Sequence, residues 1–493
     1  MITIRFVFIS LLITCLSWIS RSQEVQNSLK HEIDLWLKNP HLEHASVGIY
    51  LKDSETGKIL AQTSPQLSLV PGSTLKLVTT ATALEMLGPD FCFETRLAYS
   101  GEIKNDTLWG DLVIVGGGDP ALGSAYFKEH YLQNHFLDQW VDQLKKANIS
   151  HITGNLITDA TIFEEQPIPD TWIWEDLGNY YGAGTYALSV YDNLYTIHFS
   201  SPGQAGQPTS VNYTTPFIPG LELQNKVLSS NRNRDLAYVY GAPRSNQQII
   251  RGTIPKGRTD FKIKAAIPNP PFLLAWDLLD RMKKANISLN GFIQNQAQRQ
   301  ANRQLQPLAI TRSPELLEII RVINHESVNL FSEHLLKYLA FLIHGEGSTQ
   351  KGIDVISDFW EKRGIDTKGF FMADGSGLSH FNALTTNQLV NILYEMKSNS
   401  SYGEDFFQTL PSVPNGTLYF FNPVNFPGES LRAKSGSMTR VRCYAGELTS
   451  YHNQKMLFAI FLNNFSGSQQ NAIRLIENLL IRIAQTPALP SQK

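Results

Sequence analysis

The two ends of this chain carry the same kinds of elements in reversed order. Near the N-terminus, residues 28–37 have helical periodicity, and residues 44–63 are typical of two strands joined by a turn. Near the C-terminus, we expect neighbouring antiparallel strands at 430–449 and 455–463, and then an amphipathic helix at 469–484. Because one sheet covered by helices accommodates both ends, we predict a single mixed α+β domain that a long insertion splits.

The insertion covers roughly residues 91–293, where short strands and Gly-rich turns replace the earlier pattern. The sequence Lys-Lys-Ala-Asn-Ile-Ser occurs in it twice, at 145–150 and at 283–288, each time between an expected helix and an expected strand. We therefore favour an α/β insert built from two related helix–strand units, with a β-rich region at 201–268 between them. Downstream of the insert the pattern is helical, with expected helices at 314–324, 330–343 and 352–363.

A chain of 493 residues predicts two or three domains. Arg5, the apolar run at 6–19 and the small residues around Arg21 are typical of a secretory signal, so we expect export to the periplasm. After its removal no apolar run is long enough for an integral membrane segment. The expected boundaries are a signal peptide at 1–22, a discontinuous main domain at 23–92 and 294–493, an inserted domain at 93–200 and 269–293, and a further insert at 201–268.

Charge and cysteine content exclude several classes of protein. The formal net charge of −2 gives no reason to expect a nucleic-acid partner. Removal of the signal leaves Cys92 and Cys443, which excludes a disulfide framework and leaves two buried thiols or one bridge as alternatives. His325 and Glu326 begin a metalloprotease pattern, but Asn329 stands where the second histidine is required. We expect no metal or other cofactor, and the oligomeric state stays open.

The strongest candidate for chemistry is Ser73, at a turn that leads into an apolar helix with Lys76 three residues later. On a helix this spacing places both side chains on one face, where Lys76 can take the proton of Ser73 only if its amine is neutral. A pKa shift of roughly three units is then needed, and burial and a second cation, Lys434, would supply it. The same spacing recurs at 348–351, where Ser348 follows a polar loop and is expected to cap the next helix.

Two later motifs add to the first. Ser327-Val328-Asn329 lies between two expected helices, and Lys434-Ser435-Gly436 opens an expected strand. In this order the three motifs resemble the signature of active-site serine penicillin-binding proteins and serine β-lactamases. The long insertion, the loop at 374–379 and the Gly-Asn-x-x-x-Asp pattern at 154–159 resemble the class C low-molecular-mass penicillin-binding proteins of the penicillin-binding protein 4 type.

The resemblance implies a split transpeptidase/β-lactamase-like domain and a D-alanyl-D-alanine carboxypeptidase or DD-endopeptidase that acts on peptidoglycan stem peptides and binds β-lactams. Acyl transfer then assigns Ser73 as nucleophile and Lys76 as its base. Ser327 would relay a proton to the leaving amine, and Asn329 would hold both the substrate amide and Lys76. Serine at 435 keeps the hydroxyl of the more common threonine, so this departure from the pattern does not weaken the assignment.

The remaining expected roles concern substrate binding. Backbone N–H groups of Ser73 and Ser437 would form an oxyanion hole, and Lys434 and Ser435 would hold a terminal carboxylate. Gly436 has no side chain, which would let the strand edge approach the substrate. The resemblance also implies that Asp159 helps to hold the amino group of the stem peptide's diamino acid, whereas a turn residue after a strand is the simpler interpretation of Asp159.

Two other functions remain open. A β-lactamase or an esterase would use the same motifs, although the large insert and the lack of a recognisable deacylation glutamate argue against a β-lactamase. A non-catalytic cell-wall binding module would bind muropeptides without releasing D-alanine.

Overall fold

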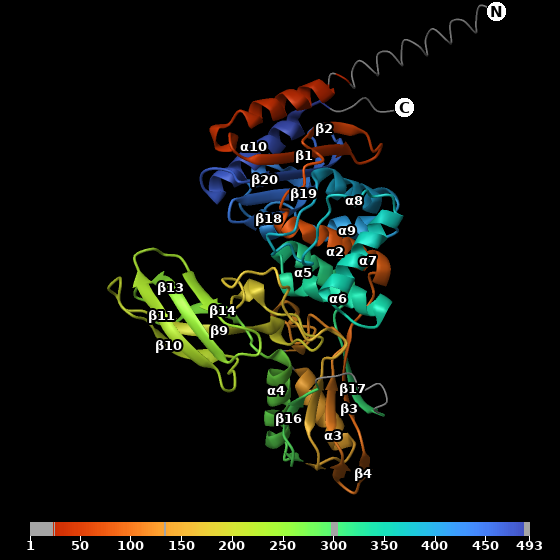
Figure 1. Ribbon diagram of the computed structural model, residues 1–493, viewed down its shortest axis with the longest axis vertical. Coiled ribbons are helices and arrows are strands. Elements are labelled where there is room, and N and C mark those ends of the chain that lie inside the picture. Colours follow the sequence, from red (N-terminus) through yellow and green to blue (C-terminus); the bar gives the residue numbers. More distant parts are fainter. Residues whose placement is uncertain (1–22, 24, 133–134, 297–303, 488–493) are drawn as a thin grey trace, which may run out of the picture.

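The structure is a computed structural model that describes residue 23 and residues 25–132, 135–296 and 304–487. The expected signal peptide at 1–22 lies outside the described residues. The molecule is elongated, with the elements of both chain ends at one extremity and the insert at the other (Figure 1). Within the described ranges, no helix combines the length and the apolar character that a membrane crossing requires.

Both ends of the chain meet in one five-stranded sheet, in the order β18-β19-β20-β1-β2. The central pair joins β1 to β20 in antiparallel register, so a strand from each end is hydrogen-bonded to the other. This confirms the predicted split α+β fold. The five strands are β1 (Ser46–Asp53), β2 (Ile59–Thr63), β18 (Leu431–Met438), β19 (Val441–Thr449) and β20 (Lys455–Asn463).

The prediction of a single strand at 430–449 was wrong. The structure has a hairpin there, in which Thr439 and Arg440 form the turn between β18 and β19. Arg440 adopts a positive φ of 59°, a turn conformation that the alternating apolar pattern on both sides concealed. The consequence is functional, because the hairpin leaves β18 and its Lys-Ser-Gly motif at the edge of the sheet.

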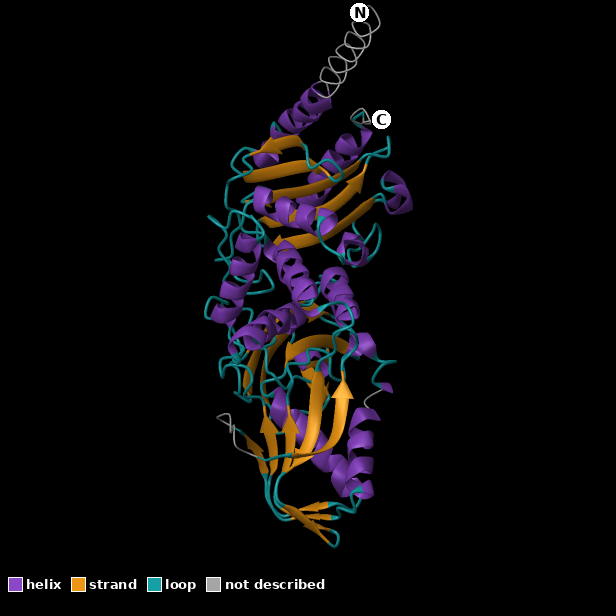
Figure 2. Cartoon of the chain, turned by 90° about the vertical axis from the view of Figure 1, so that its right-hand side faces the viewer, coloured by secondary structure: helices purple, strands orange, loops and turns teal. Residues whose placement is uncertain are grey.

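Helices cover both faces of this sheet (Figure 2). The helical residues 25–37 and α10 (Gln469–Gln485) pack with one face in a single apolar cluster. On the other face, every residue of α2 (Lys76–Leu87) from Lys76 to Leu84 is buried. Its neighbours in that cluster come from α5 (Leu316–Glu326), α6 (Asn329–His344), α7 (Thr349–Lys362), α8 (Thr386–Ser398) and α9 (Gly403–Gln408), of which α8 and α9 were not anticipated.

The two copies of the six-residue sequence occupy equivalent places in the insert. The two lysines of each copy end a helix, α3 (His135–Lys146) or α4 (Pro270–Lys284), and the asparagine has a positive φ of 55° at Asn148 and 60° at Asn286. The strands that follow pair in parallel, β7 with β15 and β8 with β16. These strands are β7 (His151–Ile152), β8 (Leu156–Asp159), β15 (Ser288–Leu289) and β16 (Ile293–Asn295).

The sheets of the insert run past two of the expected boundaries. The sheet β16-β8-β6-β3-β17 includes β16, which begins at residue 293 and continues past it, and β17 (Gln306–Arg312), and a smaller sheet has the order β15-β7-β5-β4. The β-rich region begins with β9, before residue 201, because β9 pairs with both β10 and β14. The other strands are β3 (Glu94–Tyr99), β4 (Glu102–Lys104), β5 (Thr107–Trp109), β6 (Leu112–Val115), β9 (Leu194–Ser200), β10 (Ser210–Thr215), β11 (Glu222–Ser230), β12 (Leu236–Tyr240), β13 (Gln247–Pro255) and β14 (Phe261–Ala266).

The sequence left open whether Cys92 and Cys443 form a bridge, and in the structure both are free thiols. Cys443 is buried on β19, and Cys92 is only half-buried.

Candidate active site

Ser73 lies in a short 3-10 turn, η2 (Gly72–Leu75), that continues directly into α2. Lys76 is the first residue of α2 and is 0% exposed, whereas Ser73 is half-buried and therefore reachable. The Nζ atom of Lys76 lies 3.0 Å from the Oγ atom of Ser73. The structure thus brings together the expected hydroxyl and amine.

Lys76 has two further hydrogen-bond acceptors, the Oδ1 atom of Asn329 and the carbonyl oxygen of Ser376, each at 2.6 Å from Nζ. Three acceptors match the three protons of an ammonium, and loss of one proton leaves a lone pair available to Ser73. Burial lowers the pKa of Lys76 to about 7, while the nearby Asp374 and Glu333 carboxylates act to raise it. A base whose pKa lies near neutrality suits proton abstraction from serine.

The charges of Lys76 and Lys434 interact. Burial, then the charge of Lys76, then Arg442 place the pKa of Lys434 well below its ordinary value. Because repulsion between two like charges is mutual, the expected influence of Lys434 on Lys76 stays a prediction.

Two buried acids lie beside Lys76, namely Asp374, which belongs to the loop at 374–379 that the sequence indicated, and Glu333, which the sequence analysis did not identify. Asp374 accepts hydrogen bonds from the backbone N–H groups of Gly377 at 2.7 Å and Ser379 at 2.6 Å. Two side chains also donate to it, those of Asn382 and Trp172, each at 2.8 Å. These contacts hold the 374–379 loop so that its Ser376 carbonyl meets Lys76, which places the loop at the site.

Glu333 is the second acid, and both of its carboxylate oxygens accept from the Gly375 N–H at 3.0 Å. Burial and the neighbouring Asp374 raise the pKa of Glu333 above its ordinary value. One signal could have revealed it, because Glu333 is an isolated acid inside the apolar helix expected at 330–343.

Ser327 ends α5 in the left-handed conformation, with φ 61° and ψ 35°, and α6 begins two residues later at Asn329. A serine rarely adopts this conformation, and its cost of about 1–2 kcal/mol is typical of a functional turn. The hydroxyl of Ser327 accepts a hydrogen bond of 2.8 Å from Lys434 Nζ. Lys434 also donates to the Ser435 carbonyl at 3.0 Å, so the second and third motifs meet as expected.

Edge strand β18 packs directly on the Ser73 turn. A Cβ atom added to Gly436 would lie 2.2 Å from the Pro71 carbonyl oxygen and 3.1 Å from the Ser73 nitrogen. A Cβ atom on Gly72 would lie 3.0 Å from the Ser437 nitrogen. Gly436 is therefore required by the contact with the turn, a physical reason different from the close approach to substrate that the sequence suggested.

The direction of the free N–H groups on β18 follows from its pairing. Ala433 donates its N–H to Pro411 at 3.1 Å, away from β19. Because β18 pairs with β19 without a bulge, alternate residues point the same way, so the N–H groups of Ser435 and Ser437 face this edge too. Ser437 is exposed, and the backbone contact above puts its nitrogen next to Gly72, the residue before Ser73.

Asp159 is not joined to this cluster by any hydrogen bond of the described residues. Its carboxylate accepts from the N–H of Thr161 at 3.0 Å and its hydroxyl at 2.6 Å, and from Gln296 at 3.1 Å. The insert reaches the cluster elsewhere, through the Tyr181 carbonyl, which accepts from Asn329 Nδ2 at 2.8 Å. A backbone carbonyl leaves no sequence signal, so this contact could not have been predicted.

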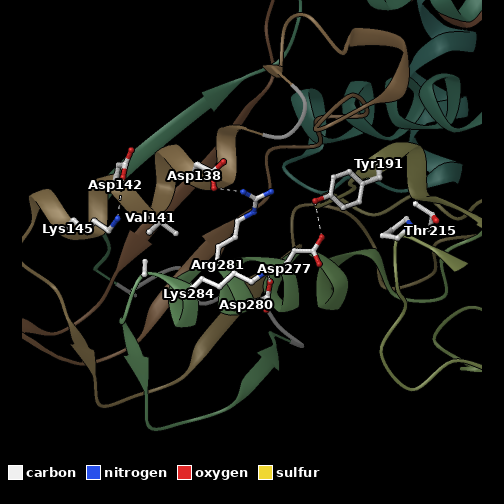
Figure 3. Close-up of a pocket in the computed structure, with 12 residues that line it drawn as sticks. Asp138, Val141, Asp142, Lys145, Tyr191, Thr215, Asp277, Asp280, Arg281 and Lys284 are labelled. Atoms are coloured by element: carbon white, nitrogen blue, oxygen red, sulfur yellow. Dashed lines mark hydrogen bonds and ion pairs between the residues drawn. The ribbon is translucent and has the colours of Figure 1, made fainter. Parts of the chain in front are cut away.

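A separate cleft of about 740 Å³ lies in the insert, between α3, α4 and the Thr215-Pro216 segment (Figure 3). Its acids and bases are engaged with one another, so no unsatisfied charge points to a ligand there. The interactions are Arg281 with Asp138, Lys284 with Asp280, Lys145 with Asp142, and the Tyr191 hydroxyl with Asp277.

Comparison with known proteins agrees with the geometry. The chain is 25% identical over 442 residues to the D-alanyl-D-alanine carboxypeptidase DacB of Haemophilus influenzae, covering 88% of each chain. It is 26% identical over 470 residues to a D-alanyl-D-alanine carboxypeptidase of Actinomadura sp. strain R39, covering 93% of this chain and 84% of the relative.

The fold is that of penicillin-binding protein 4 (dacB) from Haemophilus influenzae. The crystal structure of that protein superposes with a TM-score of 0.79 at 24% identity, covering 92% of this chain and 99% of the other. The sequence model of the D-Ala-D-Ala carboxypeptidase 3 (S13) family matches residues 29–482. That match spans the three motifs and the insert, so the chain belongs to the D-Ala-D-Ala carboxypeptidase 3 (S13) family of peptidases.

Proposed function

We propose that this protein is a serine D-alanyl-D-alanine carboxypeptidase in which Ser73 attacks the carbonyl of the penultimate D-alanine. The observation that carries the proposal is the Ser73–Lys76 contact of 3.0 Å, made by a fully buried amine whose pKa is lowered to about 7. Neutral Lys76 accepts the Ser73 proton, a new C–O bond forms, and the carbonyl oxygen takes up negative charge. The N–H groups of Ser73 and Ser437 stabilise that oxyanion.

Ser327 passes a proton to the leaving amine as the C–N bond breaks and D-alanine departs. The proton that Lys76 took from Ser73 restores the Ser327 hydroxyl, which returns Lys76 to its neutral form, and Lys434 holds that hydroxyl through a hydrogen bond of 2.8 Å. Asn329 holds Lys76 through Oδ1. Its Nδ2 donates to the Tyr181 carbonyl in this structure, so a substrate amide would replace that partner. Water then hydrolyses the acyl-serine.

The substrates that we propose are peptidoglycan stem peptides, at their D-Ala-D-Ala end or at a DD cross-link, and the compartment is the periplasm. β-Lactams would acylate Ser73 and remain attached. The related penicillin-binding protein 4 of Haemophilus influenzae has been solved in complex with a β-lactam, which supports this proposal.

The test is acylation combined with product analysis. Mature protein should be labelled covalently by a fluorescent penicillin and should release D-alanine from a peptide ending in D-Ala-D-Ala. Ser73→Ala should abolish both, whereas Ser348→Ala should change neither. Absence of labelling in folded wild type would refute the assignment of Ser73. Rapid nitrocefin turnover would favour a β-lactamase, and muropeptide binding that survives Ser73→Ala without D-alanine release from wild type would favour a binding module.

We also propose that Asp159 recognises the amino group of the diamino acid in the stem. Asp176 offers a matched comparison, because it is a buried acid of the insert whose pKa is raised above its ordinary value by burial. Asp159→Asn should weaken hydrolysis of a peptide with a diamino residue at the third position more than that of the corresponding alanine peptide. If Asp176→Asn shows this selectivity and Asp159→Asn does not, the role belongs to Asp176.

A further inference from the structure

Strand β19 carries a buried arginine that the mechanism above does not use. Arg442 is 6% exposed, and its Nε and a second guanidinium nitrogen both donate to the Tyr444 hydroxyl, the former at 2.9 Å. The guanidinium also lies over the Tyr444 ring, 4.7 Å from its centroid. Among the described residues no carboxylate forms an ion pair with Arg442. A buried charge without a counter-ion is energetically unfavourable, so an anion that binds beside Arg442 would compensate for it.

Arg442 lies immediately beside the expected substrate edge. In the hairpin register, Arg442 is opposite Ser437, and Tyr444 is opposite Ser435. Residues paired in this way have Cβ atoms about 4.5–5.5 Å apart and project from the same face. On α10, the Glu477 carboxylate acts on Tyr444 and accepts a hydrogen bond of 2.7 Å from the Asn422 N–H, but within the described residues it forms no ion pair with Arg442.

Lys434 is a weak competitor for an anion at this place. Its Nζ already donates to Ser327 and to the Ser435 carbonyl, and its pKa is well below the ordinary value. An amine whose positive charge is disfavoured in this way is a weaker partner for a carboxylate. A guanidinium keeps its charge at all relevant pH values and presents a fork of donors that fits a carboxylate.

We propose that Arg442, together with the Ser435 hydroxyl, binds the C-terminal carboxylate of the substrate. Lys434 then holds the Ser327 hydroxyl, rather than the carboxylate as the sequence suggested. The inference rests on the proposed function, because it names the group that recognises the chain end of that substrate. Peptides with a free carboxylate next to the scissile bond are therefore the preferred substrate class.

The experiment compares two peptides that end in D-Ala-D-Ala, one as the free acid and one as the C-terminal amide. Arg442→Gln should lower kcat/KM for the acid by about 10- to 100-fold, mainly through KM, and leave the amide nearly unchanged. Arg442→Lys should recover part of the loss. Arg440→Gln is the matched control, because this exposed arginine on the hairpin turn should leave both peptides unaffected.

Equal losses on acid and amide, or no loss on either, in an Arg442→Gln protein that melts like wild type would overturn the proposal. If the variant does not fold, wild type still decides. Its preference for the acid should persist from about pH 7 to about pH 9, because arginine does not titrate there. A preference that fades over this range would assign the carboxylate to a group that loses its charge there, and not to Arg442. Failure of wild type to release D-alanine or bind penicillin would instead reject the proposed function itself.

Discussion

The same Ser-x-x-Lys spacing occurs at two places in this protein, with different results. At the start of α2, the Lys76 amine is 0% exposed and meets the Ser73 hydroxyl. At the start of α7, the Ser348 hydroxyl accepts from the backbone N–H of Lys351 at 3.3 Å, as an N-cap does. The Lys351 side chain is 41% exposed and pairs with Glu346 instead.

The difference lies in what surrounds each turn. Ser348 is outside its helix, so its hydroxyl serves the free N–H groups of the first turn. Ser73 lies inside a 3-10 turn on which β18 packs, and the 374–379 loop contacts Lys76 through the Ser376 carbonyl. Spacing brings a serine and a lysine within reach of each other, and burial by other segments makes that lysine a base.

Replacement of each lysine by methionine should give the largest difference between the two copies of the motif. Lys76→Met removes the base and should slow acylation by penicillin about 10²- to 10⁴-fold, while Lys351→Met should leave the rate unchanged. Stopped-flow or gel-based labelling measures both rates. Near-wild-type acylation in Lys76→Met would mean that another group takes the Ser73 proton.

A substitution at Gly436 tests the packing of β18 on the turn that contains Ser73. In Gly436→Ala the new Cβ would meet the Pro71 carbonyl at 2.2 Å, so the strand must move away from Ser73. We expect a loss of about 1–3 kcal/mol in unfolding free energy and at least a tenfold slower acylation. Gly203→Ala is the control, because no atom lies within 4 Å of its added Cβ. Thermal melting and penicillin labelling read the two effects, and a wild-type labelling rate in Gly436→Ala would contradict the close packing.

The protonation of Lys76 predicts that the acylation rate depends on pH. Lys351 should have no part in this dependence. Acylation requires neutral Lys76, so the rate should rise with pH and level off above about 7. Glu333 raises the pKa of Lys76, so Glu333→Gln should lower that pKa and move the rising limb toward lower pH. Glu346→Gln, which alters the partner of Lys351, should not move it. If the rising limb of the pH profile of Glu333→Gln lay at higher pH instead, Glu333 would lower the pKa of Lys76 and not raise it.

The sequence predicted the parts of the site that are encoded by side-chain type. Three motifs far apart in the chain were expected to converge, and Lys76, Asn329, Ser327 and Lys434 are indeed linked by hydrogen bonds. The carbonyls of Ser376 and Tyr181 could not be anticipated, since every residue has one. The hairpin within 430–449 was missed because apolar alternation continues on both sides of its turn.

The smallest expected effect tests the other half of the comparison, the role of Ser348 as a cap. Ser348→Ala removes the acceptor for the Lys351 N–H and should destabilise the start of α7 by about 1 kcal/mol, while Ser348→Thr should retain most of the cap. Amide hydrogen exchange in the first turn of α7 detects this locally, at unchanged acylation. Faster exchange without loss of acylation would separate a capping serine from a catalytic one of identical spacing, and any fall in acylation would link the second copy to the site.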